Sequence, residues 1–158
     1  MYPVLYILMR TDLASMNAGK GMAQASHASN AFVKMATGDI VDKRAALTKQ
    51  WQEETQQGFG TVLVLGASGP EIDAAVEAAR LNQFIAGKVT DPTYPYRVES
   101  GEIAKLIPTS VDTLPRPEII DPKAPITLFR NEVTCGFIFG DKEELEALAI
   151  VSHLKLHP

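Results

Sequence analysis

The chain has 158 residues, of which 46% are hydrophobic and 22% charged, and a formal net charge of −4. This size and balance predict one globular domain over residues 1–158, without the basic coat of a protein that binds nucleic acid indiscriminately. No apolar run approaches the ~20 residues of a membrane-spanning helix, so we expect no membrane association.

The N-terminus and the cysteine content bear on the cellular compartment. Residues 1–4 lack the basic segment and the small-residue cleavage site of a secretory signal peptide. Cys135 is the single cysteine, which excludes an internal disulfide and suits a reducing environment. We therefore expect a cytoplasmic protein, and we interpret Cys135 as a small buried side chain rather than a nucleophile.

The first third of the chain predicts a strand followed by two helices. Val4–Met9 is an unbroken apolar run, typical of a strand buried on both faces. A polar loop leads into an alanine-rich helix, about Gly19–Met35, with Ser15 or Asn17 as its N-cap. A second helix over residues 40–57 ends at a glycine.

Strands and helices continue to alternate along the rest of the chain. The elements expected there are strand Thr61–Leu65, helix Glu71–Asn82, strand Phe84–Thr90, strand Glu132–Phe139 and helix Lys142–Val151. This order predicts an α/β fold of three layers, with helices on both faces of a small sheet. In such folds, ligands bind beyond the carboxyl ends of the strands.

Residues 98–130 do not fit this alternation. Their five prolines exclude a long helix or a central strand (Pro108, Pro115, Pro117, Pro122 and Pro125). We interpret residues 98–130 as a proline-rich insertion loop between the third and fourth strands, long enough to act as a lid or a docking surface.

The chemistry-bearing residues gather at the start of the first helix. Lys20, Gln24 and His27 follow at i, i+4 and i+7, so one helix face carries an amine, an amide and an imidazole. A lysine beside the free N–H groups of a first turn is suited to an anion. The segment around Lys20 lacks the flanking residues of a phosphate-binding P-loop, and the scattered histidines predict no metal site.

Each polar candidate also has a structural interpretation. Lys20 fits a solvated helix terminus, Asp12 a turn cap, and Asp91, which precedes a proline, a turn start. Thr134 fits an ordinary strand threonine, and His27 a structural histidine of the helix. From the residues alone, the chain is an α/β domain with an anion site at its first helix.

A set of motifs is dense around the first helix and comprises Arg10–Leu13, Met16, Gly19–Lys20, Ala23–Gln24 and His27–Ser29. Thinner matches continue at Val89–Asp91, Glu132–Gly136 and His153–Leu156. Together these segments resemble the type 2 peptidyl-tRNA hydrolases, the archaeal and eukaryotic kind.

The resemblance implies hydrolysis of the ester between a peptide and the 3′ end of tRNA, without metal or cofactor. It also implies a fold in which helices flank a four-stranded mixed sheet. Its matched catalytic positions are Lys20, Asp91 and Thr134. Asp91, assisted by Thr134, would activate a water molecule, and Lys20 would stabilise the oxyanion or hold terminal phosphates. We assign substrate binding to Arg10, Asp12, Gln24, His27 and Thr93.

One position departs from the family pattern. The family has a threonine four residues after its aspartate, whereas this chain has Pro95, and Thr93 is the candidate to supply the lost hydroxyl. Two alternatives stay open: a non-catalytic member that binds RNA or a protein through residues 98–130, and a hydrolase of another small acyl ester. An exposed patch on the second helix or on the insertion could support a homodimer.

Overall fold

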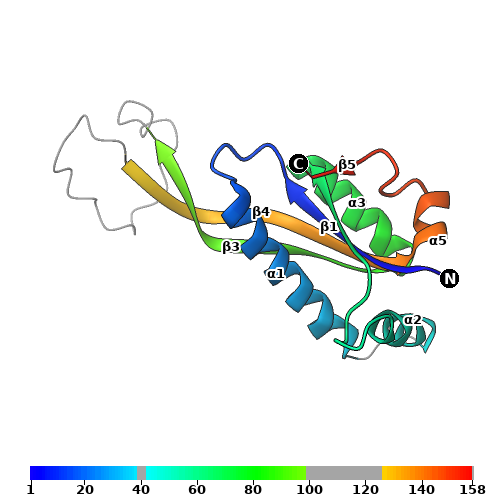
Figure 1. Ribbon diagram of the computed structural model, residues 1–158. Coiled ribbons are helices and arrows are strands. Elements are labelled where there is room, and N and C mark those ends of the chain that lie inside the picture. The colour runs from blue at the N-terminus through cyan, green and yellow to red at the C-terminus, as the bar shows by residue number, and fades with distance from the viewer. Residues whose placement is uncertain (39–41, 99–125, 158) are drawn as a thin grey trace. The chain divides into compact units, whose positions relative to one another are not determined.

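The computed structural model describes residues 1–38, 42–98 and 126–157 (Figure 1). Its elements are β1 (Pro3–Arg10), α1 (Ala18–Ala36), α2 (Asp42–Glu53), β2 (Val62–Ala67), α3 (Gly69–Leu81), β3 (Ile85–Val98), β4 (Ile126–Asp141), α5 (Lys142–Ala147) and β5 (Lys155–Leu156). The chain forms two compact units, Met1–Thr90 with Val133–Pro158, and Asp91–Glu132. The expectation of a single domain stays a prediction.

In the described part of the chain, the sheet has five strands in the order β3-β4-β1-β2-β5. β1 pairs in parallel with β2 and antiparallel with β4, so the sheet is mixed. The expected count of four strands is wrong because Lys155–Leu156 pairs antiparallel with β2, with Leu156 opposite Leu65. A strand of two residues is too short to carry the alternating pattern by which strands are predicted.

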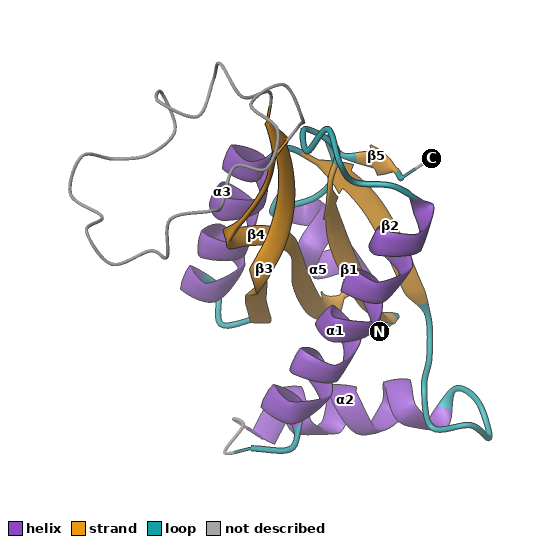
Figure 2. Ribbon diagram, turned by 90° about the vertical axis from the view of Figure 1, so that its left-hand side faces the viewer, coloured by secondary structure: helices purple, strands orange, loops and turns teal. Residues whose placement is uncertain are grey.

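Helices cover both faces of the sheet, as predicted (Figure 2). Along β1, alternate side chains enter two separate cores, which explains its unbroken apolar run. One core holds Phe32 of α1 together with Leu47 and Trp51 of α2. The opposite core holds apolar residues of α3 and of α5, among them Ile72 and Leu145.

Several element boundaries differ from the expectation. β3 continues eight residues beyond Thr90, through Pro92 and Pro95, to Val98. As an edge strand it pairs on one side only, and proline is tolerated there far better than in a central strand. β4 begins at Ile126, so both ends of the predicted insertion are strand, while residues 99–125 lie outside the described part of the chain.

Two helices also have other bounds than the sequence predicts. α5 ends at Ala147 rather than at Val151, because Ala149 takes a left-handed backbone conformation, with φ of 53°. α2 covers Asp42–Glu53, and the predicted start at residue 40 lies outside the described residues. α1 confirms the prediction to within one residue at each end.

The aromatic cluster beneath α1 gives a test of the core. Phe32 has no exposed surface, and its ring centroid lies 5.3 Å from that of Trp51 and 4.6 Å from that of Phe139. We expect Phe32→Ala to lower the free energy of unfolding by about 3–5 kcal/mol in urea titrations, because it leaves a cavity. Phe59, 47% exposed, is the matched control, and Phe59→Ala should change the free energy of unfolding by less than about 0.5 kcal/mol.

Candidate active site

The loop after β1 delivers Lys20 to the first turn of α1. Asn17 has extended backbone angles, φ −130° and ψ 173°, and its side-chain oxygen accepts a hydrogen bond from the Lys20 N–H at 3.0 Å. Of the two predicted caps, Asn17 is therefore the one used. Lys20 itself is half-buried, three residues into the helix.

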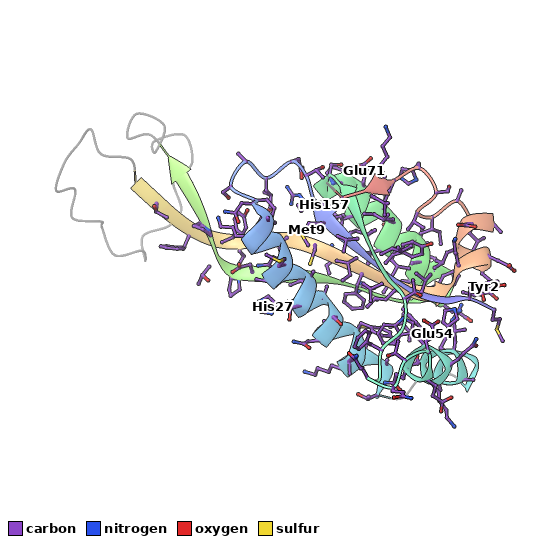
Figure 3. All side chains as sticks on the ribbon, in the orientation of Figure 1. Tyr2, Met9, His27, Glu54, Glu71 and His157 are labelled. Atoms are coloured by element: carbon purple, nitrogen blue, oxygen red, sulfur yellow. The ribbon has the colours of Figure 1, made fainter. Side chains whose placement is uncertain are left out.

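The predicted face of α1 divides into an inner and an outer side. Gln24 belongs to the buried stripe of the helix, with Gly21, Ala28 and Phe32. His27 is exposed and lies on the outside of α1 (Figure 3). At about 100° per residue, Lys20 and His27 lie side by side beyond one edge of the buried stripe, and Gln24 forms that edge.

Gln24 meets Thr134 of β4 in a buried hydrogen bond. The Thr134 hydroxyl donates to the Gln24 side-chain oxygen at 2.7 Å, and the backbone oxygen of Val89 lies 3.4 Å from the same hydroxyl. Thr134 has no exposed surface. This bond engages the oxygen of the Gln24 amide and so orients the amide group.

The next residue of β4 adds a second link to α1. The Cys135 thiol donates to the backbone oxygen of Gln24 at 3.4 Å. Burial raises the pKa of the Cys135 thiol to about 12, so it is a protonated thiol at neutral pH. The interpretation of Cys135 as a small buried side chain is confirmed.

Arg10 and Asp12 form a compact polar cluster where β1 ends. The Asp12 carboxylate accepts hydrogen bonds from Nε and Nη2 of Arg10, the second at 3.2 Å, and from the N–H of Gly69 at 3.2 Å. Nη1 of Arg10 donates to the backbone oxygen of Val133 at 2.8 Å. The hydrogen bond from Arg10 holds the pKa of Asp12 below its ordinary value, and the Gly69 N–H acts in the same direction.

Asp91 and Thr93 belong to the second unit, Asp91–Glu132. Oδ1 of Asp91 accepts hydrogen bonds from the N–H of Thr93 at 2.9 Å and from its hydroxyl at 3.3 Å. Thr93 therefore supplies a hydroxyl to the aspartate within this unit, and the approach of both residues to Lys20 stays a prediction.

Sequence patterns did not point to two of the groups at this site, the backbone oxygens of Val133 and Val89. Every residue carries the same backbone carbonyl, so such groups leave no sequence signal.

A surface cavity of about 420 Å³ lies elsewhere, among residues that include Arg44, Phe84 and Glu144.

Among the residues that the structure describes, no group of three or more His, Cys, Asp or Glu side chains could hold a metal ion. None of the helices in that part of the chain is both long and apolar enough to cross a membrane.

Comparison with known proteins gives one family. A model of that family, described as peptidyl-tRNA hydrolase PTH2, matches residues 3–118. The matched range includes Lys20, Gln24 and Asp91, and it ends before Thr134. No curated protein matches the chain.

The lowered pKa of Asp12 predicts a pH dependence of stability. A carboxylate whose pKa is depressed by folding stabilises the fold above its unfolded value of about 3.9, and this contribution is lost as pH falls through the folded value. We therefore expect the difference in unfolding free energy between the wild type and Asp12→Asn to be largest near neutral pH and to shrink on acidification. Urea titrations at a series of pH values measure it, and a constant difference would contradict the assignment.

Proposed function

Because the chain belongs to the peptidyl-tRNA hydrolase PTH2 family and so hydrolyses the ester between a peptide and tRNA, we propose that Lys20, Gln24 and Asp91 carry out this reaction. The observation that supports this most directly is the arrangement on α1. A half-buried lysine on the first turn lies one helical turn from an amide whose orientation is set by Thr134.

Lys20 is the group we assign to negative charge. It carries a positive charge at the amino end of a helix of 19 residues, where the helix dipole is also positive. Both would stabilise the oxyanion that develops when the ester carbonyl is attacked, or a terminal phosphate of the tRNA. Partial burial strengthens such interactions because fewer water molecules screen them.

Gln24 and Thr134 act as a pair in this proposal. Thr134 is fully buried and its hydroxyl donates to Gln24, which supports a role through Gln24 rather than in contact with the attacking water. Thr134 holds the Gln24 oxygen and so orients the amide, whose nitrogen is a donor of the kind that suits an ester carbonyl or the ribose of the terminal nucleotide. The pair would place this donor beside the amine of Lys20.

Asp91 is the group we assign to the attacking water. Its carboxylate accepts a proton from the water as the oxygen bonds to the ester carbon; the ester C–O bond then breaks, and the 3′ oxygen of the tRNA leaves with a proton. Thr93 holds Oδ1 of Asp91 through two hydrogen bonds, which orients the carboxylate. This assignment rests on the resemblance of Val89–Asp91 to the family strand, and no metal or cofactor takes part in it.

The setting of the reaction is also a proposal. Peptidyl-tRNA is produced in translation, and the single, buried cysteine suits the reducing cytoplasm where translation takes place. A homodimer and a substrate contact by His27 stay predictions. The exposed position of His27 on α1 is compatible with such a contact.

Release of free tRNA from N-blocked aminoacyl-tRNA tests the roles of Lys20 and Asp91. We expect Lys20→Ala and Asp91→Asn each to lower kcat by about a hundredfold or more, because each removes a charge required in the transition state. Lys34, exposed in the last turn of the same helix, is the matched control, and Lys34→Ala should retain kcat. Wild-type turnover by folded Lys20→Ala would overturn the assignment.

The role of Thr134 is tested by two substitutions of similar size. Thr134→Val removes the donor and leaves the buried Gln24 oxygen without it, so we expect a loss of stability of about 1–3 kcal/mol and a lower kcat. Thr134→Ser keeps the hydroxyl and should retain most of the activity. Equal kcat values for the valine and serine variants, in the same tRNA-release assay, would exclude a role for the hydroxyl.

A further inference from the structure

We propose that Arg10 and Asp12 are positioning residues, which hold the Thr134–Gln24 pair in place from the end of β1, rather than contacts for tRNA. The inference deepens the proposed function and rests on the role given there to Gln24. The sequence pattern assigns both residues to substrate binding, whereas their contacts lie within the protein.

The β1–β4 ladder ends one residue short of Thr134. The register runs from Pro3 opposite Asp141 to Met9 opposite Cys135. Thr134 therefore lies just beyond the last pair on this side of β4. Nη1 of Arg10, the residue after Met9, donates to the oxygen of Val133 at 2.8 Å and so extends the connection between the two strands past the end of the ladder.

Asp12 fixes the guanidinium of Arg10 in one orientation. Its carboxylate accepts from both Nε and Nη2 of Arg10, a two-point contact that sets the plane of the group. The same carboxylate accepts from the N–H of Gly69, at the start of α3. The pair thus connects three elements: the end of β1, the first turn of α3 and the strand that carries Thr134.

The close packing around Arg10 supports this interpretation. A Cβ atom built on Gly69 would lie 3.1 Å from Cζ of Arg10, so the guanidinium lies directly against the backbone of this glycine. The start of α3 is itself secured, because the Glu71 carboxylate accepts from the N–H and the hydroxyl of Ser68, each at 2.7 Å. Arg10 is therefore held against a well-anchored helix terminus.

Charge and exposure argue against a phosphate at this cluster. The side chain of Arg10 is 12% exposed, whereas that of Asp12 is 40% exposed. The side of the pair that solvent reaches is thus mainly carboxylate, which repels phosphate. Three of the nitrogen donors of Arg10 are engaged within the chain, so a phosphate would have to compete with Asp12 and with Val133.

Steady-state kinetics of tRNA release and the side-chain amide resonance of Gln24 in ¹H–¹⁵N NMR spectra test the proposal. The variants are Arg10→Gln, Arg10→Lys and Asp12→Asn, with Arg80→Gln as the matched control. Arg80 also donates to a strand carbonyl, that of Ala86 at 3.0 Å, and takes no part in the cluster. Arg10→Lys covers the case in which Arg10→Gln does not fold, since it keeps the charge and loses the two-point geometry.

We expect each Arg10 and Asp12 variant to shift the Gln24 resonance and to lower kcat about tenfold or more, with KM and its salt dependence unchanged. Arg80→Gln should leave the resonance and kcat as in the wild type. The effects of Arg10→Gln and Asp12→Asn should be less than additive when combined, because both act through one cluster.

Two results would overturn the proposal. An unchanged Gln24 resonance in folded Arg10→Lys and Asp12→Asn would show that the pair does not position Gln24. A raised KM, together with a salt-dependence slope reduced by about one, would identify Arg10 as a phosphate contact. A third outcome separates this proposal from the proposed function. If the Gln24 resonance shifts while kcat is retained, both in these variants and in Thr134→Val, the positioning of Gln24 is supported. The proposed role of Gln24 in the reaction is then wrong.

Discussion

The hydrogen bond between the Thr134 hydroxyl and the Gln24 amide joins two segments that are 110 residues apart in the chain. It is buried, so it is exchanged for water only at a substantial cost in free energy. With the neighbouring contact between Cys135 and the Gln24 backbone, it sets how α1 lies on the sheet at the end where Lys20 is found. The geometry of the amine and the amide on α1 depends on this contact.

The rest of the first unit holds in place the two elements that this bond joins, α1 with Gln24 and β4 with Thr134. Asn17 ends the loop after β1 and starts α1, so that Lys20 falls on its first turn. The aromatic cluster of Phe32, Trp51 and Phe139 anchors the far half of α1 to the sheet and to α2. On the other side, Arg10 connects the end of β1 to the residue before Thr134. A polar site is thereby supported by apolar packing on one flank and by charge-assisted hydrogen bonds on the other.

Much of the fold could be predicted because local rules and tertiary packing agree. β1 is a continuous apolar run because both of its faces are buried, and α1 has an asparagine cap and an alanine-rich interior. Predictions failed where a neighbouring segment decided the outcome. β5 exists because two residues near the C-terminus reach the edge of β2, and β3 passes through two prolines because it pairs on one side only.

By itself, the sequence determined the family, the order of most elements and the positions of the candidate catalytic side chains, since these depend on residue type and spacing. Only the tertiary structure decided what those side chains contact. Helical spacing places Lys20, Gln24 and His27 on one face, but it is Thr134 across the core that takes Gln24 as a partner. Likewise, Arg10 suits a phosphate by residue type, and it meets instead a backbone oxygen of β4, a group that every residue carries and no sequence pattern can single out.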